Sequence, residues 1–404
     1  MFSNRLPWPH RENRLTEALR RRREAGKPVL DLTESNPTRA GLVSRAAEIA
    51  AALSPPAVTY APDPRGLTPA REAVAAWLGA RGREIPPDHL ILTSSTSEAY
   101  SHLFKVLCEP GDSVLVPIPS YPLFEHLARL DAVRAVPYHL DAEHDWRLDS
   151  AALESALDSS GRPRAVIVVN PNNPTGTAFR AAERDFLDRL CAARGVAVIS
   201  DEVFFEFLFA SGEQSPAARA SAAKEGPPVS FAAASRPEAL TFTLGGLSKA
   251  GGLPQMKLGW IAATGPEPTR DEALERLVFV ADAYLSVGTP VQLAASRLLE
   301  IGDGNARRIA DRVRGNLTWL GSLLHPDSPC RLLPGDGGWS AVLRVPAVRS
   351  EEELVLLLLE EDGVLVHPGY FFDFPGEAYL VLSLLPESDA FREGVERVLG
   401  RVSA

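Results

Sequence analysis

Cysteines and long apolar runs are both scarce in this sequence. The three cysteines, Cys108, Cys191 and Cys330, show no Cys-x-x-Cys spacing, which fits a reduced compartment better than a disulfide framework. The longest uncharged apolar stretch, residues 113–124, contains three prolines and is too short to span a bilayer. The first 14 residues contain no apolar segment of the signal-peptide type. We therefore expect a cytoplasmic protein that does not enter a membrane.

Histidine pairs and an excess of positive charge are also missing. The eight histidines form no His-x-His or His-x-x-x-His pair, so the sequence predicts no metal site. The 42 Lys and Arg residues are outnumbered by 52 Asp and Glu residues, which gives a net charge of −10 and disfavours nucleic-acid binding. The basic run at residues 20–23 lies at the end of an expected helix, where cations suit the helix dipole.

Two common phosphate-binding motifs are absent as well. The sequence has no G-x-x-x-x-G-K-[ST] and no G-x-G-x-x-G after an apolar run, which excludes P-loop and Rossmann-type interpretations on motif grounds. Hydrophobic residues make up 45% and charged residues 23%, as in ordinary soluble globular proteins. A length of 404 residues leaves room for more than one domain.

Short apolar runs followed by polar or glycine-rich turns repeat along the middle of the chain. These runs lie at residues 90–92, 165–169, 196–200 and 240–244. Such runs predict parallel strands that helices cover on both faces. We therefore predict an α/β fold with a large domain at 51–290. A smaller α+β domain is expected from both ends of the chain, 1–50 and 291–404.

A polar motif follows each of these runs directly. The motif residues are Ser94–Thr96, Asn173, Asp201 and Lys249. Ligands bind beyond the carboxyl ends of the strands in open α/β sheets, and parallel strands share that edge. Any one of these residues could belong to an ordinary loop. Four of differing chemistry predict a ligand site at one edge of the sheet.

Lysine is rare, with five among 42 basic residues, yet Lys249 and Lys257 flank one glycine-rich turn. A lysine amine can lose its proton and act as a nucleophile, whereas arginine cannot. Ser94–Thr96 precede an expected helix with the capping pattern Ser95-x-x-Glu98, and a helix N-terminus can bind phosphate. An amine, a carboxylate and a phosphate site together indicate pyridoxal phosphate (PLP) as the cofactor.

At this point the sequence resembles the class I and II aminotransferases, which are fold type I PLP enzymes of the aspartate aminotransferase superfamily. Three motifs carry the resemblance: Asn170-Pro-Asn-Asn-Pro-Thr-Gly176, Ser200-Asp-Glu-Val203, and Leu247-Ser-Lys249 followed by Gly259-Trp260. The resemblance extends from about Leu30 to the last expected helix. It implies a large domain with a mostly parallel central sheet and a smaller α+β domain.

The resemblance also implies roles at the reacting end of the cofactor. Lys249 would form a Schiff base with the PLP aldehyde and then move a proton on the substrate. Asp201 would pair with the ring nitrogen, and Asn173 would hydrogen-bond the phenolic oxygen of the ring. Tyr121 matches the aromatic residue that stacks on the ring. Ser248, which precedes the lysine in its motif, belongs with the cofactor-binding residues.

The phosphate end and the assembly follow from the same resemblance. Ser95 and Thr96 match the phosphate-binding loop, and Lys257 stands where the family has a phosphate-binding arginine. Tyr60, ahead of Arg65-Gly-Leu67, matches a tyrosine that reaches the phosphate of a neighbouring subunit. This match implies a homodimer with shared active sites.

Several positions depart from the family pattern. The tyrosine expected three residues after Asp201 is Phe204, and the serine often found three residues before the lysine is Gly246. Lys257 keeps the positive charge of the arginine but not its bidentate geometry. Val381 stands where the family has the arginine that binds the substrate carboxylate. Valine cannot replace that interaction.

Two residues near the N-terminus are candidates for this missing contact. Arg39 and Asn36 lie in the segment that lines the substrate entrance in the family. A surface loop is an equally good explanation for Arg39.

The leading hypothesis is a PLP-dependent aminotransferase that moves an amino group between an amino donor and a keto acid by a ping-pong Schiff-base mechanism. A PLP-dependent lyase or decarboxylase on the same fold is the alternative, because Val381 replaces the usual arginine. The expected partners are small-molecule amino and keto substrates. A DNA-binding regulator is disfavoured, because about 30 residues precede Leu30 and the net charge is acidic.

Overall fold

The fold is seen in a computed structural model, which describes residues 2–6, 12–43, 46–54, 57–209, 225–233, 236–325 and 327–403. Residues 211–237 are rich in Ala, Ser and Pro, a composition that predicts a surface loop, and they lie in large part outside the described residues. Among the described residues, no helix is both long enough and apolar enough to cross a membrane.

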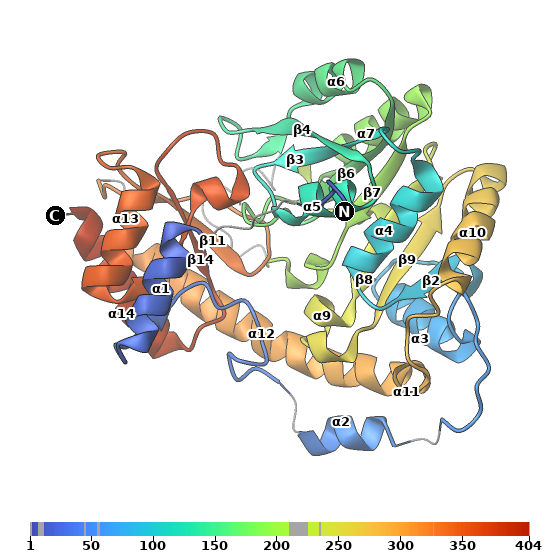
Figure 1. The fold of residues 1–404 in the computed structure, drawn as a ribbon, viewed down its shortest axis with the longest axis horizontal. Helices are drawn as coiled ribbons and strands as arrows, with labels where there is room; N and C mark the ends of the chain where they lie inside the picture. Colours follow the sequence, from blue (N-terminus) through green and yellow to red (C-terminus); the bar gives the residue numbers. More distant parts are fainter. Residues whose placement is uncertain are drawn as a thin grey trace.

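An eight-stranded sheet in the order β2-β9-β8-β7-β6-β3-β4-β5 forms the centre of the molecule (Figure 1). Its strands are β2 (Leu90–Thr93), β3 (Ser113–Ile118), β4 (Arg134–Asp141), β5 (Arg147–Leu148), β6 (Pro163–Val169), β7 (Ala197–Asp201), β8 (Thr241–Gly246) and β9 (Gly259–Thr264). The strands from β8 to β4 pair in parallel, and the outer pairs are antiparallel. This confirms the predicted mostly parallel central sheet.

Helices cover both faces of this sheet, as the buried apolar strands require. One face packs against α4 (Thr96–Leu107), α5 (Leu123–Leu130) and α10 (Glu267–Asp282). The other face packs against α3 (Thr68–Gly79), α6 (Ser150–Ser159), α7 (Ala181–Arg194) and α9 (Leu247–Ala250), together with the start of α12 (Ala295–Leu323). Two short helices, α2 (Ala46–Ala52) and α11 (Thr289–Leu293), lie against α12.

A second, antiparallel sheet in the order β10-β11-β14-β13 lies beside the first. Its strands are β10 (Arg331–Leu332), β11 (Ser340–Arg344), β13 (His367–Pro368) and β14 (Tyr379–Ser383). The largely apolar residues 364–367 predict a single short strand, but in the structure they divide at Val366 into two. β12 (Val364–Leu365) leaves this sheet and pairs in parallel with β1 (Leu30–Asp31).

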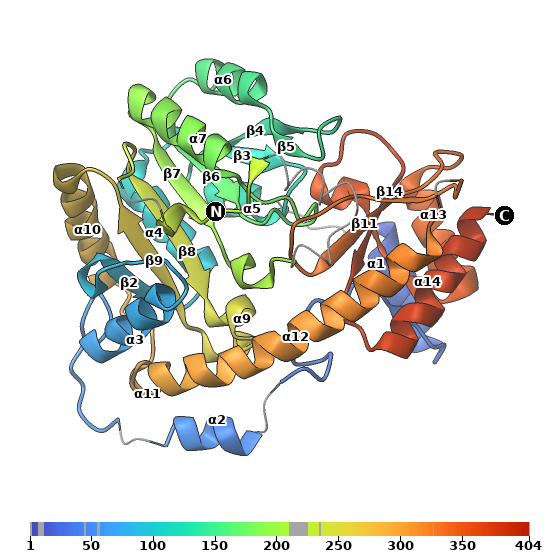
Figure 2. The same ribbon diagram turned by 180° about the vertical axis from the view of Figure 1, so that it is seen from behind.

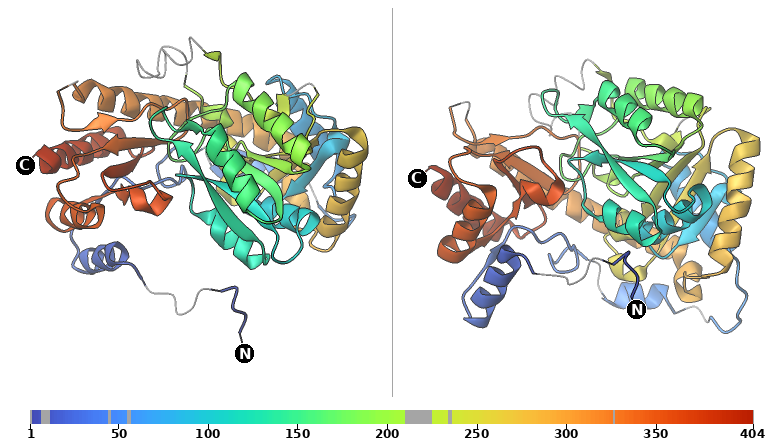
Figure 3. Two further views of the ribbon diagram at one scale, coloured as in Figure 1. Left: turned by 90° about the horizontal axis from the view of Figure 1, so that it is seen from above. Right: turned by 45° about the horizontal axis from the view of Figure 1, so that its top comes forward.

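Both ends of the chain contribute to the core around the second sheet. Leu15 of α1 (Arg14–Glu24) and Leu32 are buried in one cluster with Val395 of α14 (Ser388–Ser403). α1 also contacts α13 (Glu351–Leu357), and both views of Figure 3 show the blue helix near the red helices of the C-terminal region, while the two termini themselves lie apart. α12, at 29 residues, runs from the central sheet to the second one (Figure 2). The domain limits of 50 and 290 stay predictions.

A glycine-rich loop, residues 335–338, joins the second sheet to the carboxyl edge of the central sheet. Asp336 N and Gly337 N both donate to the carbonyl of Gly176, at 2.8 and 3.1 Å. A Cβ atom on Gly176 would lie 2.6 Å from the carbonyl oxygen of Gly337. The loop at 335–338 and the loop that contains Gly176 therefore touch through their backbones, and only glycine permits so short a distance.

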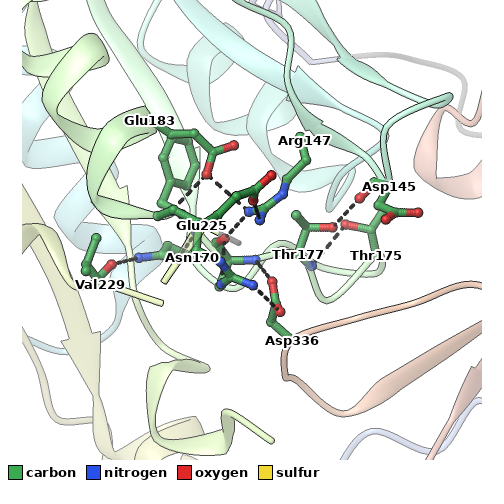
Figure 4. A network of polar contacts seen from close by, with 12 residues as sticks. Asp145, Arg147, Asn170, Thr175, Thr177, Glu183, Glu225, Val229 and Asp336 are labelled. Carbon is green, nitrogen blue, oxygen red and sulfur yellow. Dashed lines mark hydrogen bonds and ion pairs between the residues drawn. The ribbon is translucent and has the colours of Figure 1, made fainter. Parts of the chain in front are cut away.

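A buried ion pair fixes this contact (Figure 4). Asp336 Oδ1 accepts a hydrogen bond from Arg180 Nη2 at 2.7 Å, and Asp336 Oδ2 accepts one from Ala178 N at 3.0 Å. The side chains of Arg180 and Asp336 are 2% and 7% exposed. Next to this pair, Arg147 pairs with Glu183 and Glu225 (Figure 4). Removal of Asp336 would leave the guanidinium buried without its carboxylate.

We expect Asp336→Asn to destabilise the fold by about 3–5 kcal/mol, because one partner of a buried pair remains uncompensated. The control is Glu300→Gln, which breaks an ion pair with Arg297 whose side chains are 61% and 60% exposed. Such an exposed pair contributes about 0–1 kcal/mol. Urea unfolding followed by circular dichroism measures both changes. Equal midpoints for the two variants would contradict the proposed importance of the pair.

Candidate active site

A cavity of about 280 Å³ lies at the carboxyl edge of the central sheet, against the start of β11. Seven of the predicted site residues line it: Ser95, Thr96, Tyr121, Asn173, Asp201, Ser248 and Lys249. They come from five segments that are far apart in the sequence. Five of them, Ser95, Thr96, Asn173, Asp201 and Lys249, are residues that the strand-end argument places at this edge, whereas Tyr121 and Ser248 come from the family resemblance. The individual roles of all seven stay predictions.

Asp201 ends β7 and is the carboxylate of this cavity. Its Oδ2 accepts a hydrogen bond from the hydroxyl of Tyr100 at 3.0 Å, and its Oδ1 accepts one from Val203 N at 3.2 Å. Burial raises the pKa of Asp201 to about 6, while these two donors and the Lys249 amine oppose the rise. A cationic group in the cavity would favour the ionised carboxylate further.

Lys249 follows β8 within the short helix α9 and lines the same cavity. Burial lowers the pKa of its amine, and the Asp201 carboxylate partly opposes this effect. The Nζ atom lies 5.1 Å from the ring centroid of Trp339 and 5.8 Å from that of Phe204. The amine thus lies near two aromatic rings, and its lowered pKa means that a larger fraction of it is uncharged and nucleophilic.

The N-terminus of α4 supplies an anion site at the other end of the cavity. Ser95 is the N-cap residue, and its Oγ accepts a hydrogen bond from Glu98 N at 3.2 Å. Thr96 and Ser97, in the first turn, line the cavity, where the first N–H groups of a helix have no intrahelical acceptor. The positive end of the helix dipole favours a negative group here.

Glycines form part of the cavity wall between these groups. Gly246 and Gly259 face one another at the ends of β8 and β9. A Cβ atom on Gly259 would lie 3.1 Å from the carbonyl oxygen of Gly245 and 3.2 Å from Thr93 Oγ1. A larger residue would therefore disturb the wall, and the glycines leave a flat backbone surface.

Asn173 and Tyr121 lie on loops that hydrogen bonds tie together. Ser120 Oγ donates to Asn172 Oδ1 at 3.0 Å, and Ser120 N donates to the carbonyl of Phe372 at 3.0 Å. Ser340, at the start of β11, donates to Asn173 Oδ1 at 3.4 Å. The second sheet therefore contributes directly to the position of this side of the cavity.

Four predicted residues do not line the cavity. Lys257 is exposed, one residue before the cavity-lining Leu258, and Tyr60 is 79% exposed. Arg39 is exposed and lies 3.9 Å from Glu34. Asn36 Oδ1 accepts hydrogen bonds from the backbone and side chain of Thr38. The roles expected for these four residues stay predictions.

Of the lining residues that the sequence does not predict, Tyr100, Trp339 and Ser340 carry polar groups that matter most for the site. Tyr100 has the helical spacing of an ordinary core position, although a buried tyrosine hydroxyl needs a partner. Trp339 and Ser340 follow the glycine-rich loop and lie about 80 residues beyond Trp260, the end of the last motif. Only the contact between the two sheets brings them to the cavity, and no local pattern signals it.

We expect the Lys249 amine to react with acetic anhydride at lower pH than N-acetyl-lysine amide does, because burial lowers its pKa. Asp201→Asn should shift the midpoint of the Lys249 labelling profile further down, since the carboxylate that favours the ammonium form is removed. Mass spectrometry of the Lys249 peptide measures the profile in protein freed of bound ligands. A midpoint equal to that of the free compound would show that the amine is not desolvated.

Comparison with known proteins places this chain among aminotransferases. The family model "Aminotransferase class I and II" matches residues 27–393. The chain is 27% identical to an alanine aminotransferase of Mycobacterium tuberculosis over 353 residues, 83% of this chain and 76% of that protein. It is 25% identical to the glutamate-pyruvate aminotransferase AlaA of Escherichia coli over 385 residues, 92% of this chain and 89% of that protein.

Solved structures agree with the fold. A crystal structure of an aminotransferase from Escherichia coli matches with a TM-score of 0.82 and 23% identity, over 100% of this chain and 98% of that one. An alanine aminotransferase from Pyrococcus furiosus matches with a TM-score of 0.81 and 22% identity, over 96% of both chains.

These relatives support the aminotransferase hypothesis and not the lyase or decarboxylase alternative. The family model extends over most of the chain. It covers all the residues that line the cavity, including the lysine, asparagine and aspartate motifs. This chain therefore belongs to the class I and II aminotransferase family and is a transaminase.

Proposed function

We propose that this transaminase uses PLP as its cofactor and moves an amino group between a small-molecule amino donor and a keto acid in two half-reactions. The observation that carries the proposal is the content of one cavity. A desolvated lysine amine, a buried carboxylate and a free helix N-terminus face the same space, at Lys249, Asp201 and Thr96.

The chemistry of these groups fits PLP. The N-terminus of α4 would hold the phosphate, and Lys257 would add a positive charge near it. Asp201 would hold the ring nitrogen in its protonated form. Gly246 and Gly259 form part of the cavity wall, and a Cβ atom at either position would crowd the neighbouring backbone. When bound, PLP supplies an aldehyde for amine exchange and a ring that accepts electrons.

The protein side chains then carry out the proton movements. Lys249 Nζ would take a proton from the substrate carbon and return it, because burial lowers its pKa and increases the share of the uncharged form. The Asp201 carboxylate, whose ionised form is favoured by its two hydrogen bonds, would hold a positive charge on the ring nitrogen. Phe204 and Trp339 line the cavity beside the amine, with ring centroids 5.8 and 5.1 Å from Lys249 Nζ. Asn173 and Tyr121 would orient the ring from its edge and face.

The names of the relatives suggest which substrates to test first. Alanine, glutamate, pyruvate and 2-oxoglutarate are the amino and keto acids of alanine and glutamate-pyruvate aminotransferases. Val381 lies in β14 at 3% exposure and cannot bind their carboxylates. We propose Arg39 and Asn36, next to the cavity-lining Ser35, as the residues that do so instead.

We also propose a cytoplasmic homodimer with shared active sites. Tyr60 is 79% exposed and Val58 is 88% exposed, although both are large apolar or aromatic residues. Tyr284 and Phe279 are likewise exposed, at 54% and 82%. A second copy would cover such residues and would bring its own Tyr60 toward the phosphate end of the cavity.

We expect the purified protein to form a keto product from L-alanine or L-glutamate when PLP and a keto acid are present. Borohydride should fix PLP on the Lys249 peptide. Lys249→Ala should abolish that label and lower the rate by at least ~10²-fold, because the nucleophile and proton carrier is lost. The control is Lys27→Ala, which changes an exposed lysine. Labelling that persists in Lys249→Ala would overturn the proposal.

We expect Arg39→Ala to raise the KM of the keto acid by about 10-fold or more with a smaller change in kcat, because a charge-assisted contact to the carboxylate is lost. Arg349→Ala, at an exposed arginine before α13, serves as the control. Steady-state kinetics with two keto acids measure both variants. If Arg39→Ala keeps the wild-type KM, another group binds the carboxylate.

A further inference from the structure

Each oxygen of the Asp201 carboxylate has one donor from the protein. Val203 N donates to Oδ1 at 3.2 Å, and the hydroxyl of Tyr100 donates to Oδ2 at 3.0 Å. Val203 is two residues from Asp201 and moves with it. Tyr100 belongs to α4, about 100 residues earlier, so it connects the carboxylate to a different element. Together the two donors fix the rotation of the carboxylate about its side chain.

Packing holds Tyr100 in this position. Its side chain is 2% exposed, and its ring centroid lies 5.4 Å from that of Phe124 in an edge-to-face contact and 6.0 Å from that of Phe104. Burial and the neighbouring carboxylate raise the pKa of Tyr100 well above its ordinary value, so the hydroxyl keeps its proton and acts as a donor. Tyr100 also lines the cavity. A rigid donor is therefore built into the cavity wall behind Asp201.

The carboxylate needs such a donor because it is buried. Its surroundings favour the neutral acid, and a neutral acid cannot hold a positive charge on a ring nitrogen. The other titratable groups that face Asp201 are Lys249 from α9 and Tyr121 from the loop before α5. When Lys249 is occupied with the cofactor, the Tyr100 hydroxyl remains as a donor to the ionised form.

We propose that Tyr100 is a positioning residue of the transaminase, which holds Asp201 ionised and correctly oriented toward the ring nitrogen of the cofactor. This inference rests on the proposed binding of PLP in the cavity. Tyr100 does not contact the reacting atoms in this account and acts through Asp201.

The chain provides a matched control in Tyr138. Its side chain is 1% exposed, and its hydroxyl donates to the carbonyl of Ile167 at 2.9 Å. Tyr100→Phe and Tyr138→Phe each remove one buried hydroxyl and one hydrogen bond from the protein. Tyr138 lies in the cluster of β4, α6 and α7 and does not line the cavity. The two variants should lose similar stability and differ in their effect on the cofactor.

The experiment measures the PLP dissociation constant of the wild type and of both variants by equilibrium dialysis, with thermal unfolding in parallel. We expect Tyr100→Phe to weaken PLP binding by about 10-fold or more, because a hydrogen bond to a charged group is lost, and Tyr138→Phe to leave it unchanged. As the pH falls, PLP affinity should be lost at a higher pH in Tyr100→Phe than in the wild type. The reason is that removal of the donor raises the pKa of the Asp201 carboxyl.

A double-mutant cycle separates the positioning role from general loosening of the fold. In an Asp201→Asn background, Tyr100→Phe should no longer change PLP affinity. Tyr100→His, which keeps a donor, should retain more affinity than Tyr100→Phe, and it provides a second variant if the phenylalanine protein does not fold. Equal PLP affinities for wild type and Tyr100→Phe would overturn this inference and leave the proposed function unaffected. Equal losses of PLP affinity in both tyrosine variants would do the same. Failure of the wild type to bind PLP would overturn the proposed function as well.

Discussion

The register of three parallel strands determines where the chemistry of this protein lies. β7 pairs with β6 so that Asp201 is opposite Val169, and with β8 so that Asp201 is opposite Leu244. β6 and β7 therefore end at the same level, and β8 continues a little further, to Gly246. The polar residues that follow them can meet only at this edge, because a parallel sheet gives its strands a common direction. A shift of one strand by a single residue would turn its last side chain to the other face of the sheet.

Burial gives this arrangement its reactivity. In water, a lysine amine and an aspartic acid would both be charged at neutral pH. In the cavity, burial favours the neutral form of each, so their pKa values move toward each other. The hydrogen bonds from Tyr100 and Val203 oppose this effect and favour the ionised carboxylate, while the rings of Phe204 and Trp339 lie near the amine. Desolvation therefore favours the uncharged amine as a nucleophile, and the two donors favour the anion against the same desolvation.

The sequence predicts the parts of the site that follow a local pattern. Asp201 and Lys249 each come directly after an apolar strand, so their edge of the sheet follows from strand direction alone. Tyr100 escapes this reasoning because its spacing is that of any buried helix residue. Trp339 escapes because it reaches the cavity through the glycine loop and the Arg180–Asp336 pair, which are contacts between distant segments. The role of Tyr60 depends on a second copy of the chain, so one chain cannot test it.

The absence of an arginine in β14 affects more than one side chain. Val381 is opposite Val342 in β11 and His367 in β13, and it is buried in a cluster with aromatic residues. Within that cluster the Trp146 ring meets Phe374 edge-on at 5.1 Å, and Phe374 stacks on Tyr379 at 4.6 Å. A guanidinium at position 381 would need space and hydrogen-bond acceptors among these rings, at the cost of burying its charge. The surroundings of Val381 thus suit a valine, and no arginine among the described residues lines the cavity. The cavity as lined by the described residues therefore offers no guanidinium to a substrate carboxylate, and the proposed role of Arg39 would place that contact on the segment that contains Ser35.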